Sequence, residues 1–306
     1  MMSLALRSIL TACLIAAVVL CFSIGVLASN LPRVVGGPDV HETRDLRLPS
    51  APGLHLINED GSTQIYTHPV DEITVQASIM VYNRAHLDDT VLQNFVKSLV
   101  TATPLGDSLR IVTEPDERPD NIDLRVDYVI KAPPGTDISV EGSNGNVWIA
   151  KSCGSVEVKG RNADIEIAGP QGAVDAQSTN GRIRVIDAPE GARIKTVNGN
   201  IYAHMLGGSL EAATTNGAIV ARVLDPNVAQ CTLSSQNGGI TVLVAENCTA
   251  SVDAVTDRGT VKSDLPLDVT CGMQKNRHLK GTIGAGHTIL KIDTLNGNIW
   301  IAKGSA

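Results

Sequence analysis

Residues 178–221 read STNGRIRVIDAPEGARIKTVNGNIYAHMLGGSLEAATTNGAIVA and contain Asn-Gly three times, at intervals of eighteen residues. The same interval continues toward the N-terminus. A period this short and regular is typical of stacked repeat architectures. No comparable pattern indicates a chemical activity. The asparagines of this column are Asn144, Asn162, Asn180, Asn198 and Asn216, and all but Asn162 are followed by glycine.

Aliphatic residues recur every nine residues through the same region. Val147 and Ile149 flank Trp148, and this period of two places both aliphatic side chains on one face of a β-strand. A glycine commonly stands two residues before each pair and indicates a turn, because glycine reaches positive φ without steric cost. The first series of inward positions is Val147, Val156, Ile165, Val174, Ile183, Ala192, Ile201, Leu210 and Ile219. The second is Ile149, Val158, Ile167, Ala176, Val185, Ile194, Ala203, Ala212 and Ala221.

Nine residues therefore make one turn and one short strand. The pattern predicts an all-β, single-domain β-solenoid (β-helix) with two strands in each coil of about 18 residues. A meandering antiparallel sandwich is the alternative, although it would not require the same turn residue at every second turn. Asparagine suits turns, and its amide can bond its counterpart in the next coil. We predict that the five asparagines form a structural turn ladder; the alternative is a polar stripe that binds a ligand.

The rest of the chain divides by composition. Residues 29–53 are rich in Pro, Gly and charge and are predicted to be a linker. Residues 54–136 are predicted to form an N-terminal β segment with one short helix at about 88–100, where apolar residues recur at helical intervals. Regular coils are expected over 137–262, and an irregular loop with a closing coil over 263–306. The closing coil is expected because residues 295–303 nearly copy residues 143–151.

An apolar run from Ile9 to Ala28 lies near the N-terminus. Val26-Leu27-Ala28 suits signal-peptide cleavage, while the length of the run is sufficient to span a bilayer. Residues 1–28 are therefore predicted to be a signal peptide or a membrane anchor. Both alternatives place the rest of the chain outside the cytoplasm, whether secreted, periplasmic or at the cell surface, and a membrane contact is expected only through residues 9–28.

The sequence offers no pattern for a catalytic, cofactor or metal site. The formal net charge of −7 argues against nucleic acid as a partner. The histidines form no metal-binding motif, and the cysteines include no CxxC pair. Cys231 and Cys248 are about one coil apart, so they are either disulfide neighbours or separate thiols. Beyond the apolar run the cysteines are Cys153, Cys231, Cys248 and Cys271, whose pairing the sequence leaves open.

Outward positions of the coils are the remaining candidates for function. Asp175, Arg193 and Glu211 alternate in charge at the spacing of one coil, which is typical of a solvated salt-bridge ladder. The alternative is a set of catalytic carboxylates. Trp148, Tyr202 and His204 mark the best candidate binding surface, because exposed aromatic rings suit a sugar or a protein partner.

The chain resembles a known family. Its Pro134-Gly135-Thr136 turn is followed by repeated Asn-Gly-x-Ile-x-Val units and by a closing Gly-x-Gly segment with a last Asn-Gly coil over 284–301. This order of parts resembles the putative adhesins of the β-strand-repeat type, a domain of unknown function, over residues 54–303. The resemblance implies an envelope-associated β-helical adhesin, scaffold or interaction module that is not an enzyme. We also expect no cofactor, and we expect the partner to be an unidentified envelope protein or surface glycan. Two alternatives are a carbohydrate-active parallel β-helix enzyme and a membrane-anchored regulatory partner of an envelope complex.

Overall fold

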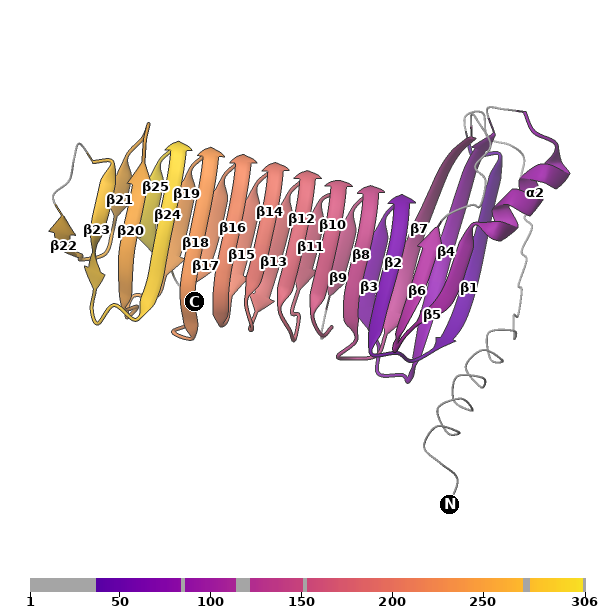
Figure 1. Cartoon of the computed structure of the whole chain (residues 1–306), viewed down its shortest axis with the longest axis horizontal. Coiled ribbons are helices and arrows are strands. Elements are labelled where there is room, and N and C mark those ends of the chain that lie inside the picture. Colours follow the sequence, from indigo (N-terminus) through magenta and orange to yellow (C-terminus); the bar gives the residue numbers. More distant parts are fainter. Residues whose placement is uncertain (1–36, 84–85, 114–121, 151–152, 272–275, 305–306) are drawn as a thin grey trace, which may run out of the picture.

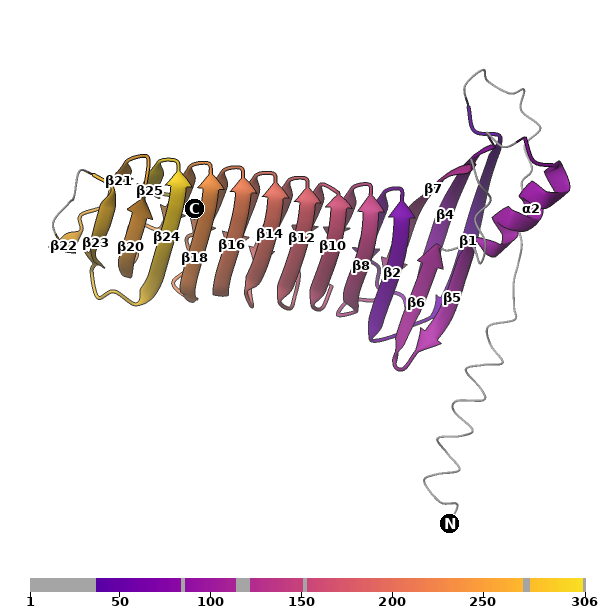
Figure 2. The ribbon, with the colours of Figure 1, turned by 45° about the horizontal axis from the view of Figure 1, so that its top comes forward.

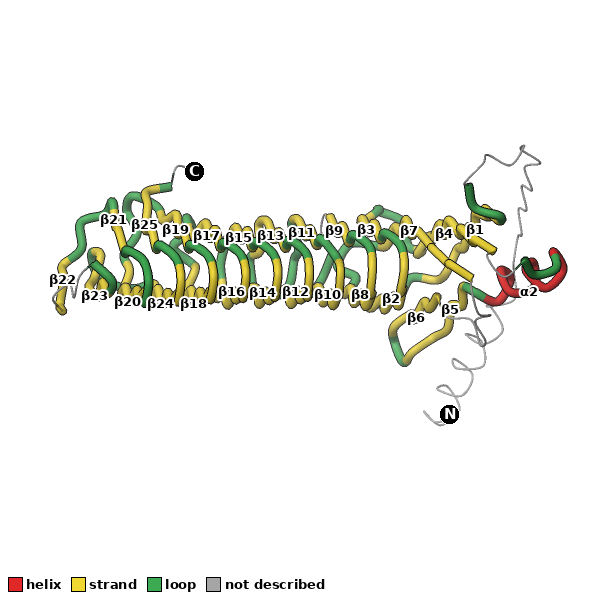
Figure 3. The backbone as a smooth tube through the Cα atoms, turned by 90° about the horizontal axis from the view of Figure 1, so that it is seen from above, coloured by secondary structure: helices red, strands yellow, loops and turns green. Residues whose placement is uncertain are grey.

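Successive asparagines of the column lie side by side, because strands of neighbouring coils pair in parallel and in register. Asn162 pairs with Asn180, and Asn180 pairs with Asn198. The computed structural model describes residues 37–83, 86–113, 122–150, 153–271 and 276–304. These residues form an elongated solenoid of two long sheets facing one another (Figures 1 and 3), which confirms the predicted β-solenoid. The predicted signal peptide or anchor lies outside the described residues. None of the helices described is both long and apolar enough to cross a bilayer.

The regular coils alternate between two sheets, which we name sheet A and sheet B. Each coil contributes one strand to sheet B and then turns into a strand of sheet A (Figure 2), at Asn-Gly in every case but Asn162-Ala163. The strands of sheet B in this region are β8 (Asp137–Asn144), β10 (Val156–Asn162), β12 (Val174–Asn180), β14 (Ala192–Asn198), β16 (Gly208–Asn216) and β18 (Val228–Asn237). Those of sheet A are β9 (Val147–Ala150), β11 (Ile165–Ala168), β13 (Ile183–Ala188), β15 (Ile201–Met205), β17 (Ile219–Val223) and β19 (Ile240–Val244).

The predicted register of the core is correct. Val156 and Val174 in sheet B and Ile165 and Ile183 in sheet A are all buried between the sheets. The residues that follow them in the sequence, such as Glu157, reach solvent. Both series of aliphatic positions identified in the sequence therefore line the thin core.

Glycine is needed in these turns mainly because neighbouring turns pack closely, and less because of a positive φ. Gly181 has a positive φ of 157°, whereas Gly199 and Gly217 are not among the positive-φ glycines. A Cβ atom added to Gly199 would overlap the carbonyl oxygen of Gly181, and one added to Gly217 would overlap that of Gly199. Stacked turns approach so closely that the carbonyl group of one turn occupies the space that a side chain in the next turn would need.

At the N-terminal end, the outermost coil is not the first in sequence. The coil of β6 and β7 lies outside the coil of β2 and β3, because β6 pairs with the outer edge of β2 and β7 with that of β3. Antiparallel β4 and β1 then extend sheet A, and antiparallel β5 extends sheet B. The elements are β1 (Val40–Pro49), β2 (Gly53–Asp60), β3 (Thr63–Thr67), β4 (Glu72–Asn83), α2 (Asp89–Ser98), β5 (Val100–Leu105), β6 (Ser108–Thr113) and β7 (Ile122–Ala132).

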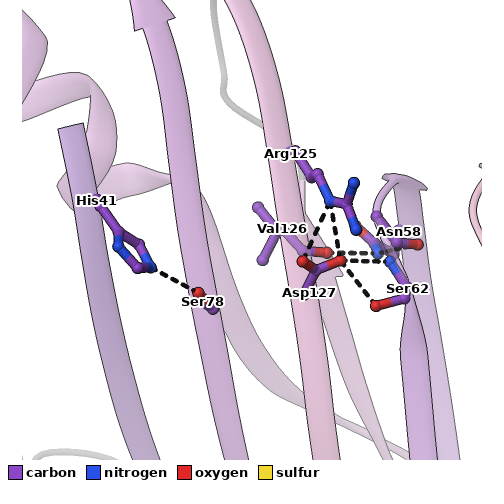
Figure 4. A network of polar contacts seen from close by, with 8 residues as sticks. His41, Asn58, Ser62, Ser78, Arg125, Val126 and Asp127 are labelled. Atoms are coloured by element: carbon purple, nitrogen blue, oxygen red, sulfur yellow. Dashed lines mark hydrogen bonds and ion pairs between the residues drawn. The ribbon is translucent and has the colours of Figure 1, made fainter. Parts of the chain in front are cut away.

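Polar contacts join these two coils at the β2–β3 turn (Figure 4). Nδ2 of Asn58 donates to the carbonyl oxygen of Val126 over 2.9 Å. Asp127 accepts from the backbone nitrogen of Ser62 at 2.6 Å and from its hydroxyl at 2.8 Å. Nε of Arg125 lies 3.1 Å from both oxygens of Asp127. Figure 4 also shows His41 of β1 bonded to Ser78 of β4, at 3.0 Å.

The N-terminal region contains the predicted helix and a strand that was not predicted. The expected helix at 88–100 is α2, whose N-cap Asp88 accepts from the backbone nitrogen of Thr90 and whose last turn is held by Arg44 through the carbonyl of Val96 at 2.6 Å. The linker predicted over 29–53 is wrong for residues 40–49, which form β1. This strand alternates half-buried and exposed residues at the edge of sheet A. Charged side chains are common on edge strands, and for this reason the composition of β1 resembles that of a linker.

The C-terminal end shows the same exchange of order. The coil of β24 and β25 was expected to close the stack, but it lies between the coil of β18 and β19 and that of β20 and β21. Antiparallel β23 and β22 then extend sheet B beyond β20, so part of the expected irregular loop is strand. The elements are β20 (Ala250–Thr256), β21 (Val261–Ser263), β22 (Asp268–Cys271), β23 (His278–Ile283), β24 (Thr288–Asn296) and β25 (Ile299–Lys303).

Candidate binding surface

The five predicted asparagines are joined directly by their side chains. Nδ2 of Asn162 donates to Oδ1 of Asn144 at 2.6 Å, and Nδ2 of Asn180 donates to Oδ1 of Asn162 at 2.8 Å. Asn198 and Asn216 continue the series with bonds of 2.7 Å each. These groups are exposed, yet each amide in the middle of the ladder uses both its oxygen and its nitrogen on neighbouring coils.

The ladder extends beyond the column predicted from the sequence. Asn237 donates to Asn216 and Asn296 donates to Asn237, both over 2.8 Å. At the other end, Asn144 donates to the carboxylate of Asp60 over 2.6 Å. Asn237 and Asn296 also stand in Asn-Gly dipeptides. They depart from the eighteen-residue interval because additional residues lie between these coils in the sequence.

A second, buried ladder lies two residues before the asparagines and was not predicted. The hydroxyl of Thr196 donates to the carbonyl of Gly181 at 3.1 Å, and that of Thr214 donates to Gly199 at 3.0 Å. The signal for it is a Ser or Thr in the pattern [Ser/Thr]-x-Asn-Gly, which the sequence shows repeatedly. The other members, each bonded to a turn carbonyl, are Ser178, Ser235, Thr294 and Thr256, of which Thr256 precedes Arg258-Gly259 in place of Asn-Gly.

The predicted aromatic residues lie on the outer face of sheet A. Trp148 and Tyr202 belong to one row of outward side chains, separated by Glu166 and Arg184. Trp148 is 38% exposed and meets the ring of Tyr66 edge-on at 5.7 Å. The guanidinium of Arg184 lies 5.4 Å from the ring centre of Tyr202, within cation–π range. His204 lies in the adjacent row and is held by Asp187, 2.7 Å from Nδ1.

The structure adds Trp300 to this row. Trp300 follows Tyr202 after Val220 and Thr241 and is 46% exposed. Its Nε1 donates to Asp264 at 3.0 Å, which fixes the ring. The segment around Trp300 repeats that around Trp148 in sequence, but its place next to β19 depends on the exchanged order of the C-terminal coils.

Charged side chains on sheet B face one another as predicted. Asp175 pairs in register with Arg193, and Arg193 pairs with Glu211. Nζ of Lys195 lies 2.9 Å from Glu211, and this hydrogen bond, followed by the charges of Lys195 and Arg193, lowers the pKa of the Glu211 carboxyl. Pairs of this exposure contribute about 0–1 kcal/mol.

The same face carries a shallow groove of about 1300 Å³. The β5–β6 hairpin walls one end, with Leu105 and Ser108 in the lining, and bends out of the plane of the rest of sheet B (Figure 3). Glu157 in its floor lies 2.6 Å from Lys159, and Asp137 accepts from the backbone and hydroxyl of Ser155 at 2.7 Å each. Glu157, Asp137 and Glu211 of the lining are therefore each engaged by a neighbouring side chain.

The cysteines do not form the disulfide considered from the sequence. Cys231 and Cys248 are both thiols. Burial raises the pKa of Cys231 to about 12 and that of the buried Cys153 to about 11, and it also raises the pKa of Cys248. The side chain of Cys271 is not among those that the structure describes. Among the described residues, no three His, Cys, Asp or Glu side chains gather in a way that could hold a metal ion.

Comparison with known proteins agrees with this architecture. The fold is shared with a crystal structure described as a "putative adhesin" from Bacteroides fragilis, with a TM-score of 0.51 and 13% identity over 86% of this chain and 97% of that one. A "putative adhesin" from Parabacteroides distasonis gives a TM-score of 0.44, with 10% identity over 85% and 96% of the two chains. A "putative lipid binding protein" from the same organism gives 0.38, with 10% identity over 88% and 98%. The search of curated proteins found no match. Residues 111–302, more than half of the chain, match the toastrack domain DUF4097, and the chain therefore belongs to this family.

Proposed function

We propose that the chain is a non-enzymatic, extracytoplasmic adhesin or interaction scaffold whose contact surface is the outer face of sheet A. The observation that carries this proposal is the row from Trp148 through Tyr202 to Trp300, which places both tryptophans of the chain in solvent on one flat face. Aromatic residues are enriched where proteins bind partners, because they offer a large contact area with few rotatable bonds.

The scaffold beneath the row supports such a role. Tyr66, Arg184 and Asp264 each hold one of the rings. The strands that carry the rings are paired on both sides within sheet A. A surface held in this way loses little conformational entropy on binding.

The compartment belongs to the same proposal. The apolar run at Ile9–Ala28 supports export, either as a cleaved signal peptide or as a retained anchor. The fold shared with the Bacteroides fragilis protein, which is described as a putative adhesin, is consistent with a surface role. Extraction of membranes from the native host with carbonate and then with detergent distinguishes a secreted from an anchored chain.

The enzyme alternative lacks support from the carboxylates. A glycosidase or lyase site usually contains an acid whose pKa is raised by its surroundings. The pKa of Glu211 is instead lowered by Lys195, and Glu157 is paired with Lys159. We expect no depolymerisation of common polysaccharides by the full chain, as checked by reducing-end release.

An adhesion assay tests the proposal. The full chain, immobilised on beads, is expected to retain intact cells or isolated envelopes of its host. The triple variant Trp148→Ala, Tyr202→Ala and Trp300→Ala should lose most of this retention at an unchanged melting temperature. A matched variant on sheet B, Glu157→Gln with Asp175→Asn, should retain them like the parent. Equal retention by all three proteins would remove sheet A as the contact surface, and no retention by the parent would contradict the adhesin function.

A further inference from the structure

The three rings of this row belong to one repeated unit; Trp148 and Trp300 are exposed and Tyr202 is half-buried. Each is the last residue of an Asn-Gly-Asn-[Val/Ile]-aromatic segment, and the other Asn-Gly turns of the chain lack both the second asparagine and the ring. The second asparagine precedes the ring by two residues, at the end of the turn that leads into the strand, and all three of these asparagines are exposed. The three pairs are Asn146 with Trp148, Asn200 with Tyr202, and Asn298 with Trp300.

The pairs are equally spaced along the solenoid. Two outward residues, Glu166 and Arg184, separate Trp148 from Tyr202, and two others, Val220 and Thr241, separate Tyr202 from Trp300. Because neighbouring strands lie about 4.8 Å apart, each interval is about 14 Å. The exchanged position of β25 produces the second interval, since Trp300 would otherwise stand one coil farther away, beyond β21.

Two of the three asparagines, Asn200 and Asn298, are oriented by hydrogen bonds from the backbone. Oδ1 of Asn200 accepts from the backbone nitrogen of Ala218 at 2.8 Å, and Oδ1 of Asn298 accepts from that of Thr260 at 3.0 Å. Asn146, Asn200 and Asn298 are all exposed. With its oxygen engaged in this way, the carboxamide of Asn200 or Asn298 presents its Nδ2 donor to solvent beside an aromatic ring.

The charge along the row is balanced. Glu166 and Arg184 approach one another to 3.9 Å, and Val220 and Thr241 are uncharged. An anionic polymer would require a surplus of Lys and Arg, and a cationic one a surplus of Asp and Glu. A ligand matched to this row is therefore uncharged, carries polar groups that accept from amides, and has apolar faces that pack on rings. Its features also repeat along its length.

We infer that the three Asn-aromatic pairs form a binding site for an uncharged polysaccharide that lies along the long axis of the solenoid. A sugar ring has an apolar C–H face for Trp or Tyr and hydroxyl groups at its rim for the asparagine. A chain that reaches two or three pairs gains affinity from each successive contact, because every pair after the first binds within an already formed complex. This inference rests on the proposed function and specifies its ligand.

Intrinsic fluorescence tests the inference directly, because Trp148 and Trp300 are the two tryptophans of the chain. The full chain is titrated with soluble uncharged β-glucan and mannan, and with a uronic-acid polymer of matched length. At least one uncharged polymer is expected to shift or quench the emission, and the uronic-acid polymer should not. Oligosaccharides too short to span 14 Å should bind about tenfold more weakly than those that reach two rings.

Variants separate the site from the fold. Trp148→Ala, Tyr202→Ala and Trp300→Ala should each weaken binding about tenfold, as removal of an aromatic anchor does. Tyr202→Ala retains both tryptophans and so keeps the fluorescence signal. Asn200→Asp keeps the acceptor for Ala218 but removes the outward donor, so it should weaken binding without lowering the melting temperature. Tyr82→Ala, an aromatic change on β4 outside the row, is the matched control and should bind like the parent.

The outcomes that overturn the inference differ from those that overturn the adhesin function. If no uncharged polymer changes the emission while beads still retain cells through sheet A, the ligand is not an uncharged glycan. Retention that survives enzymatic removal of surface glycans would identify a protein as the occupant of the row. Preference for the uronic-acid polymer, or equal binding of short and long oligosaccharides, also contradicts the inference.

Discussion

Asn144 donates a hydrogen bond of 2.6 Å from Nδ2 to the carboxylate of Asp60. Every later asparagine of the ladder, up to Asn296, donates in the same direction, toward the N-terminal end of the solenoid. The amide dipoles are therefore aligned, and the positive end of the series meets a negative charge. Aligned hydrogen bonds polarise and strengthen one another, and a charged acceptor is the strongest end for such a series.

Interrupting the ladder in its middle should cost more stability than shortening its end. Asn180→Ala removes bonds to both Asn162 and Asn198, so we expect a loss of about 1–2 kcal/mol in the free energy of unfolding. Asn296→Ala removes one bond, to Asn237, and should cost about half as much. Urea denaturation of the two variants measures the difference. Equal tolerance of both changes would show that the ladder does not contribute to stability.

The register of the core gives a sharper contrast between neighbouring residues. Val174 is 3% exposed between the sheets, and Val174→Asp buries an unpaired carboxylate at a cost of several kcal/mol. Asp175 points to solvent and accepts from Gln177 at 2.9 Å, so Asp175→Val should change stability by less than about 1 kcal/mol. Thermal melts of both variants test the register, and the reverse order would contradict it.

The regular coils could be predicted from the sequence because the pattern that defines them is local. Val156 and Val158 show their shared face within three residues, and Asn162 to Asn180 shows the coil length directly. The ends could not be predicted in this way. The pairing of Ala250 with Thr288 places β24 between β18 and β20. It joins residues far apart in sequence, and no periodic pattern indicates it.

The row of rings on sheet A could be predicted only in part, for the same reason. Trp148 and Tyr202 stand at visible outward positions of regular coils, whereas the place of Trp300 follows from the coil order at the C-terminal end. The strand β1 shows the converse limit. Every second residue of it is exposed and the others are only half-buried, so its charged composition did not distinguish it from a linker.

The buried hydroxyl ladder should contribute through a hydrogen bond and not through packing. Thr196→Val keeps the shape of the side chain but leaves the carbonyl of Gly181 without its donor, so we expect a loss of about 1–2 kcal/mol. Thr196→Ser keeps the hydroxyl and should cost less. Chemical denaturation compares the two. A smaller loss for valine than for serine would mean that the methyl group, and not the hydroxyl, stabilises the turn.

The cysteines should differ in reactivity toward alkylating reagents. Cys231 is fully buried, and burial raises its pKa to about 12, so at pH 8 almost none of it is the reactive thiolate. Cys248 is half-buried and should be alkylated before Cys231 in the native protein. Peptide mapping by mass spectrometry after timed treatment with iodoacetamide measures both rates. Faster modification of Cys231 would show that the sheets open at β18.

Deletion of the C-terminal coil should affect two neighbours and not one. Residues 288–306 include β24 and β25, which fill the space between the coil of β18 and β19 and the coil of β20 and β21. A chain that ends at residue 287 leaves β18 and β20 without their shared partner, so we expect β20–β23 to detach while the coils before β18 stay folded. Hydrogen exchange should then show full loss of protection over 250–283 and retained protection over 156–223. Protection of 250–283 in the truncated chain would mean that β20 can dock on β18 directly, in which case the exchanged coil order is not required for closing this end of the solenoid.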